Sequence, residues 1–168
     1  IFIDCSGDSI LAELSGAEYR HGREARGDYG EAAAPQTEDK QTMGNSCLLQ
    51  VRETAEPTPF IPPQWARKLP EEENLEIRDH MPNSYRDNNF WWLELGGNKN
   101  TIDDAEEIRD ELLKLSFGIW DHIKNTGDHK AENWELDWAG FLPGKRESRR
   151  YIGDHILNQR KVQSSAAC

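Results

Sequence analysis

The chain has 168 residues, of which 36% are hydrophobic and 30% are charged, and its formal net charge is −11. This length accommodates one domain, or one domain and part of another. The negative charge argues against nucleic acid and membrane surfaces as partners, because an acidic surface repels phosphate backbones and anionic lipid.

The first 40 residues predict a strand, a short helix and a loop. The apolar run at residues 1–3 predicts a strand that enters a tight turn at residues 4–8. Residues 9–16 predict a helix that stops at Gly16. Its apolar side is expected to contain Ile10, Leu11 and Leu14. Residues 17–40 are charged and rich in glycine, and we expect a loop there.

The middle of the chain predicts two strands with a linker and an acidic patch between them. Residues 42–53 predict a strand, because apolar and polar residues alternate near its end. Four prolines within residues 56–63 indicate an extended linker. Three glutamates at residues 71–73 indicate a solvated acidic patch. The aromatic run at residues 90–95 predicts a strand that stops at a Gly-Gly pair.

The clearest predicted element is a helix from about Thr101 to Asn125. Thr101 is expected to cap its start, acidic residues occupy its first turns, and Gly127 follows its expected end. Its apolar residues recur at spacings of three and four: Ala105, Ile108, Leu112, Leu115, Ile119 and Ile123.

After this helix the pattern changes to a strand. Residues 134–142 alternate apolar and polar residues, as a half-buried strand does. Pro143-Gly144 predicts a turn, and residues 149–157 predict the start of another helix. The predicted strands and helices alternate irregularly, and no internal repeat is present. The predicted fold class is therefore α+β or mixed α/β.

The apolar runs and the cysteines point to no membrane span and no metal site. No run approaches the roughly 18 to 20 residues that span a bilayer, and the chain shows no signal-peptide pattern. The three cysteines are Cys5, Cys47 and Cys168, and they form no metal-binding signature, so no metal site is expected. We expect Cys5 and Cys47 to be small buried hydrophobes. A reducing, cytoplasmic compartment is compatible with these features.

Two segments are candidate ligand sites. In the first, a strand leads through Cys5, Ser6, Gly7 and Asp8 into a helix, a turn that lets backbone approach a planar or phosphorylated ligand. The same turn also occurs in α/β proteins that bind nothing there. In the second, four cations stand within residues 145–150 of an acidic chain. Their guanidinium groups suit carboxylates and phosphates, and the alternative is a solvated basic turn.

The histidines are weaker candidates. His122 and His129 flank the end of the long predicted helix, and imidazole carries protons near neutral pH. A histidine beside a helix end is more often a capping or surface group. No arrangement typical of a Ser or Cys nucleophile stands out.

Together these pieces resemble a known family. The matching stretches, in sequence order, are FIDCSGD at 2–8 with AEYRHGREA at 17–25, TMGNS at 42–46, WWLELGG at 91–97, EEIRDELL at 106–113, WDHIKN at 120–125 and FLPGKRESRR at 141–150. In this order they resemble the FAD-dependent oxidoreductases with a glutathione-reductase-type flavin fold, and the likeness extends to about Gln159.

The resemblance implies a division of the chain. Residues 1–40 would form part of an FAD-binding region, 41–140 a substrate-side domain, 141–160 a segment returning to the flavin domain, and 161–168 a disordered tail. Cys5, Ser6, Gly7 and Asp8 would lie near the cofactor, although the family's Ala-Thr-Gly is here Cys-Ser-Gly. Arg146 and Arg149 would be the substrate-side candidates.

One departure from the family matters most. The 168 residues contain no G-x-G-x-x-G motif, with which such enzymes hold the FAD pyrophosphate. The family's later flavin-binding segment is missing too. We therefore expect an internal fragment, inactive alone, whose partners are a small-molecule substrate and the remainder of a parent flavoprotein. The alternatives are a non-catalytic binding module and the inactive product of a truncated gene.

Overall fold

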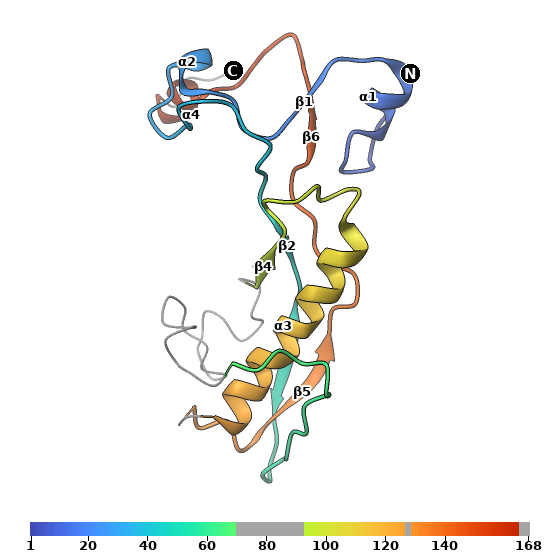
Figure 1. Cartoon of the computed structure of the whole chain (residues 1–168), viewed down its shortest axis with the longest axis vertical. Helices are drawn as coiled ribbons and strands as arrows, with labels where there is room; N and C mark the ends of the chain where they lie inside the picture. Colours follow the sequence, from blue (N-terminus) through green and yellow to red (C-terminus); the bar gives the residue numbers. More distant parts are fainter. Residues whose placement is uncertain (70–92, 127–128, 165–168) are drawn as a thin grey trace. The chain divides into compact units, whose positions relative to one another are not determined.

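The computed structural model describes residues 1–69, 93–126 and 129–164, and it combines helices with short antiparallel sheets (Figure 1). The predicted mixture of α and β structure is therefore confirmed. None of the helices described is long and apolar enough to span a bilayer. The helices are α1 Ile10–Ser15, α2 Arg26–Tyr29, α3 Ala105–Asn125 and α4 Gln159–Gln163; the strands are β1 Tyr19–His21, β2 Asn45–Ser46, β3 Leu49–Glu53, β4 Glu94–Leu95, β5 Trp134–Ala139 and β6 Arg149–Tyr151.

The chain divides into two compact units. Unit 1 contains residues 1–44, 97–102 and 145–168, and unit 2 contains residues 45–96 and 103–144. Each unit therefore draws on segments that are distant in the sequence.

Unit 1 is built around the pairing of β1 with β6. The two strands lie side by side (Figure 1). They are antiparallel, with Tyr19 opposite Tyr151 and His21 opposite Arg149. Helix α1 precedes β1 and ends at Gly16, whose φ of +75° is a conformation that glycine adopts without steric cost. The strand pairing therefore brings residues 149–151 beside residues 19–21.

Unit 2 holds the larger hydrophobic core. Strands β3 and β5 pair antiparallel, and β2 pairs with β4. Apolar residues of β3 and α3 pack together with residues from two loops: Leu49, Val51, Leu93, Ile119, Trp120, Ile123 and Ala131. Burying one Val, Leu or Ile side chain stabilises the fold by about 2 kcal/mol. The long apolar stripe of α3 thus explains most of the core of this unit.

Two contacts of α3 fix the loops around it. At Gly118 a Cβ atom would lie 2.2 Å from the carbonyl oxygen of Arg67, and the N–H of Arg67 donates to the carbonyl of Lys114 at 2.9 Å. Near the C-terminal end of α3, the Lys124 ammonium donates to the carbonyls of Ala131, Glu132 and Trp134 at 2.7, 3.0 and 2.7 Å. Burial lowers the pKa of this lysine. These contacts attach the segments before and after α3 to the helix.

Several predicted elements agree with the structure. Helix α1 lies within the predicted residues 9–16, α3 ends at Asn125 as predicted, and β5 lies within residues 134–142. The proline-rich residues 56–63 form no helix or strand. The predicted strand at 90–95 is described only from residue 93, where β4 follows. The acidic patch at 71–73 and Gly127 lie outside the described residues.

Other predictions are wrong. Residues 1–3 form no strand, because no described segment pairs with their backbone. Residues 149–151 form β6 rather than a helix, because β1 supplies their hydrogen-bond partners. The predicted loop 17–40 contains β1 and α2, and residues 161–163 of the predicted tail belong to α4.

The predicted helix boundaries and faces also need correction. Helix α3 begins at Ala105 after Asp104, and Thr101 is buried in the turn before it instead of capping it. In α1, Ile10 and Leu14 are exposed, and Ala12 is the buried residue. The apolar pattern of α1 therefore marks an uncovered face in this chain.

The close contact at Gly118 makes a stability prediction. We expect Gly118→Ala to lower the free energy of unfolding by about 1–3 kcal/mol, because the new Cβ would overlap the Arg67 carbonyl. Urea unfolding measures this change. Gly27→Ala is the matched control, because Gly27 is also helical but its Cβ would meet open space. An unchanged stability of Gly118→Ala would contradict the described contact.

A second stability prediction concerns Lys130, which is exposed and has a φ of +52°. A left-handed conformation costs a residue with a Cβ about 1 kcal/mol. We expect Lys130→Gly to raise the free energy of unfolding by about that amount, measured by thermal and urea unfolding. Lys130→Ala removes the same charge but keeps the Cβ, so it should give no such gain.

Candidate functional site

The turn between residues 4 and 9 is held by its own side chains. The Asp4 carboxylate accepts from the backbone N–H groups of Ser6 and Leu11 at 2.9 and 3.0 Å. The Ser6 hydroxyl accepts from the N–H groups of Asp8 and Ile10 at 3.3 and 3.1 Å. Cys5, Ser6 and Gly7 are exposed, and a Cβ at Gly7 would meet nothing within 4 Å. The turn therefore presents an open backbone surface.

Asp8 joins this turn to the basic run. Its carboxylate accepts from the Lys145 ammonium at 2.6 Å and from the Ser148 hydroxyl at 2.7 Å. Its backbone carbonyl accepts from Nε of Arg149 at 2.8 Å. Partial burial raises the pKa of Asp8, but the hydrogen bonds from Lys145 and Ser148 outweigh it, and the pKa lies below its ordinary value. The structure thus brings together the two segments that the sequence singled out.

The arginines of the basic run differ in their partners. Arg149 also forms an ion pair with Glu13 and lies 5.6 Å from the centre of the Tyr19 ring, and its side chain is 11% exposed. Arg150 donates to the Gly22 carbonyl at 2.7 Å and to Glu24 at 2.8 Å. Arg146 is exposed and has no hydrogen-bond or ion-pair partner among the described residues. Two guanidinium groups are therefore occupied by protein, and the third is open to solvent.

A hydrogen-bonded pair that the sequence analysis did not single out lies beside the turn. The Tyr151 hydroxyl donates to the Asp4 carboxylate at 2.5 Å. Hydrogen bonds from Ser6 and from Tyr151 hold the pKa of Asp4 well below its ordinary value, and the bond to Asp4 raises the pKa of Tyr151. Only the antiparallel pairing of β1 with β6 brings Tyr151 to this position, so no local sequence signal could reveal the pair.

Asp4 and Tyr151 line a cavity of about 590 Å³. The remaining lining residues are Phe2, Leu11, Leu14 and Ser15. Small-molecule sites are typically concave and mostly apolar, with a few polar groups that orient the ligand. This cavity has that character, and its polar groups are also those with the shifted pKa values.

The two candidate histidines lie together in unit 2. His122 of α3 and His129 are 2% and 5% exposed, and their ring centres are 4.9 Å apart in an edge-to-face contact. Nδ1 of His122 is 3.0 Å from the carbonyl oxygen of Leu69. The structure therefore places both as buried packing groups, and their role as proton carriers stays a prediction.

The cysteines differ from each other. Cys47 is 1% exposed and its thiol donates to the Gly140 carbonyl at 2.7 Å, so its prediction as a buried hydrophobe is confirmed. Burial raises the pKa of this thiol. The same prediction is wrong for Cys5, which is exposed because it lies in the open turn. Among the described residues, no group of three or more acidic, His or Cys side chains is placed to hold a metal.

The lowered pKa of Asp8 sets a pH dependence. Because the folded-state pKa is below that of the unfolded chain, about 3.9, Asp8 stabilises the fold above that pH. This contribution is lost as the pH falls through the folded-state pKa. We expect Asp8→Asn to cost about 2 kcal/mol at pH 7 and progressively less below pH of about 4, measured by urea unfolding across pH.

The matched control for Asp8→Asn is Asp28→Asn. Asp28 is 3.6 Å from Arg20 and both side chains are over 40% exposed, so this change should cost less than about 0.5 kcal/mol at any pH. Equal effects of the two substitutions at pH 7 would contradict the role assigned to Asp8.

Comparison with known proteins gives one informative result. A family described as FAD dependent oxidoreductase matches residues 1–168, which extends beyond about Gln159, the limit of the likeness found in the sequence. No curated protein and no solved structure matched the chain. Because the family match covers the whole chain, including the Asp4–Tyr151 cavity and the Asp8 contacts, this protein belongs to the FAD-dependent oxidoreductase family.

Proposed function

We propose that this chain is part of a flavoenzyme of the glutathione-reductase-type flavin fold. The enzyme would pass a hydride or an electron pair between a small organic substrate and FAD. The family match over residues 1–168 carries this proposal. The cavity beside the turn at residues 5–8 supports the proposal, because apolar side chains and the hydrogen-bonded Asp4–Tyr151 pair line it together.

The described residues fit one portion of FAD. The apolar lining of the Asp4–Tyr151 cavity, with Leu11 and Leu14, is suited to a planar ring system. The pyrophosphate fits less well, because two of the nearby cations already have protein partners: Lys145 binds Asp8, and Arg149 binds Glu13. The G-x-G-x-x-G motif that would supply backbone N–H groups to phosphate does not occur in these 168 residues. We infer that this chain contacts the ring portion and leaves the phosphates to other residues.

The chain's own residues would orient and hold protons at this site. When bound, FAD supplies the redox chemistry. The Tyr151 hydroxyl keeps its proton because Asp4 accepts its hydrogen bond and raises its pKa. The carboxylate of Asp4 in turn fixes the direction of the phenol, so Tyr151 presents a positioned polar group at the edge of an apolar cavity.

The proposal includes a partner for unit 1. Large apolar side chains that do not line the Asp4–Tyr151 cavity stand exposed on it, among them Ile1 and Ile3. Exposed apolar groups that gather in one region typically mark a surface that another protein surface covers. We propose that the remainder of a parent flavoprotein covers them, and that the isolated chain does not turn over.

A second candidate function is a non-catalytic binding module. The observation that favours it is the core of unit 2, in which α3 and β3 bury a contiguous apolar cluster. A self-sufficient module should unfold in one cooperative transition, whereas a broad, gradual transition would favour the flavoenzyme part.

Flavin titration tests the proposed function. We expect this chain to bind FAD with a Kd above about 10 µM and to bind riboflavin within about threefold of FAD, because only the ring is contacted. Leu14→Asp should weaken the binding of both FAD and riboflavin. Ile61→Asp, which alters an apolar residue of unit 2 that is also largely exposed, should weaken the binding of neither. A sub-micromolar Kd for FAD, or FAD bound more than 10-fold tighter than riboflavin, would overturn the inference.

A further inference from the structure

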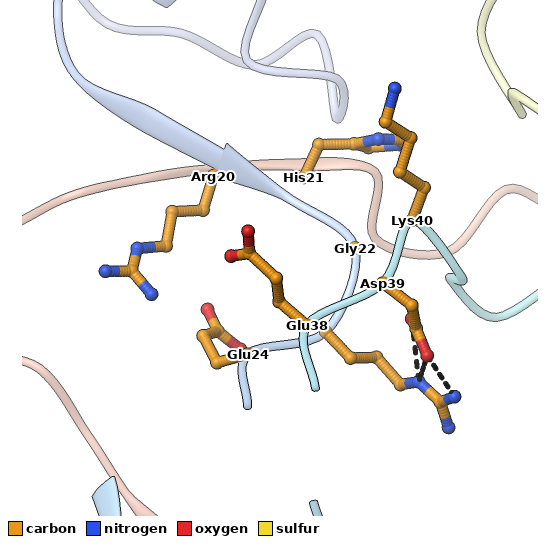
Figure 2. Close-up of a pocket in the computed structure, with 8 residues that line it drawn as sticks. Arg20, His21, Gly22, Glu24, Glu38, Asp39 and Lys40 are labelled. Atoms are coloured by element: carbon orange, nitrogen blue, oxygen red, sulfur yellow. Dashed lines mark hydrogen bonds and ion pairs between the residues drawn. The ribbon is translucent and has the colours of Figure 1, made fainter. Parts of the chain in front are cut away.

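A second cavity in unit 1, of about 460 Å³, lies where the chain leaves β1 (Figure 2). Residues 20–24 form one side and residues 38–40 the other. Arg23 and Asp39 exchange two backbone hydrogen bonds, of 3.0 and 3.1 Å, across the two segments. None of these residues lines the Asp4–Tyr151 cavity, so the two cavities are separate sites.

The frame of this cavity is held tightly. Gly22 has a φ of +84°, and a Cβ there would lie 2.0 Å from the carbonyl oxygen of Asp39. Only glycine allows the two backbone segments to approach this closely. The Gly22 carbonyl also accepts from Arg150 of β6 at 2.7 Å. Backbone contacts therefore fix the two segments that form the cavity.

Most charges of the lining have partners within the protein. Arg23 binds Asp39 at 2.5 Å, and Glu24 binds Arg150 at 2.8 Å. Arg20 lies 3.6 Å from Asp28. These pairs neutralise one another, so they give the cavity no net preference for an anion or a cation.

Three polar groups of the lining remain unpaired among the described residues. The ammonium of Lys40 and the carboxylate of Glu38 are exposed to solvent, and neither has a hydrogen bond or an ion pair among the described residues. Nε2 of His21 is shielded from solvent and has no hydrogen-bond partner. A shielded polar atom without a partner costs about 1–3 kcal/mol. A ligand that pairs with His21 would recover that free energy, and its pairing with Lys40 and Glu38 would replace the hydration of two exposed charges.

We propose that this cavity binds a small zwitterion that carries a carboxylate and an ammonium group. Lys40 would bind the carboxylate and Glu38 the ammonium, both through charge-assisted hydrogen bonds. The imidazole of His21 can pair with either end of the ligand, because its nitrogen donates or accepts according to the tautomer. A simple anion would meet the unpaired Glu38, and a simple cation would meet Lys40, so both are disfavoured. The site does not depend on flavin binding.

The test uses this chain and a set of amino acids of increasing length: glycine, 4-aminobutyrate and 6-aminohexanoate. Hexanoate and hexylamine are matched probes that each lack one charge. Calorimetry gives the affinities, and imidazole NMR signals, assigned with His21→Gln, locate the site. We expect one zwitterion to shift the His21 signals, to bind with a Kd of about 1 mM or tighter, and to bind about 10-fold tighter than hexanoate and hexylamine.

Charge-removing variants separate this site from nonspecific binding. Lys40→Gln and Glu38→Gln should each weaken the preferred zwitterion about 10-fold, and Lys130→Gln, an exposed lysine of unit 2, should leave the affinity unchanged. Thermal unfolding of each variant shows whether it is folded. The proposal is overturned if no zwitterion shifts the His21 signals, if the one-charge probes bind equally well, or if Lys130→Gln weakens binding as much as Lys40→Gln.

Discussion

The Asp8 carboxylate binds Lys145, 137 positions later in the chain, and Ser148 at 2.7 Å, so one acidic side chain closes unit 1. Arg149 adds a hydrogen bond to the Asp8 carbonyl. Strand β6 begins at Arg149, directly after Ser148, and pairs with β1. The positions of Tyr151 at one cavity and of Arg150 beside the other both follow from this junction. A group with several charged and hydroxyl donors holds its position better than a single exposed ion pair does.

The contacts of Asp8 also change how the basic residues within 145–150 are interpreted. In a chain with a net charge of −11, four clustered cations indicate an anion site. The structure instead pairs Lys145, Arg149 and Arg150 with the carboxylates of Asp8, Glu13 and Glu24. Carboxylates of the protein itself therefore neutralise most of the local positive charge. The groups left for ligands are less conspicuous in the sequence: the Asp4–Tyr151 pair, Arg146, and the Lys40 and Glu38 charges.

The two units differ in how they are stabilised. Unit 2 relies on apolar packing of α3 against β3, with backbone segments held close at Gly118 and at Lys124. Unit 1 relies more on hydrogen bonds and ion pairs, such as those of Asp8, Arg149 and Arg150. Binding sites need concave, partly polar surfaces, and in this chain both cavities discussed above belong to unit 1. The division matches the usual separation of a packed scaffold from the segments that carry chemistry.

Local patterns in the sequence determined the elements whose stability is local. The apolar stripe of α3, the stop of α1 at Gly16 and the extended proline-rich segment all follow from periodicity or backbone preference, and all are present. The ordered stretches also indicated the FAD-dependent oxidoreductase family, which the family match shows. What only the tertiary structure decided are the pairings between distant segments: β6 as a strand, Tyr151 against Asp4, and the frame of Gly22 against Asp39. Residues 149–151 have no local pattern that selects a strand, because their hydrogen-bond partners lie about 130 positions earlier in the chain.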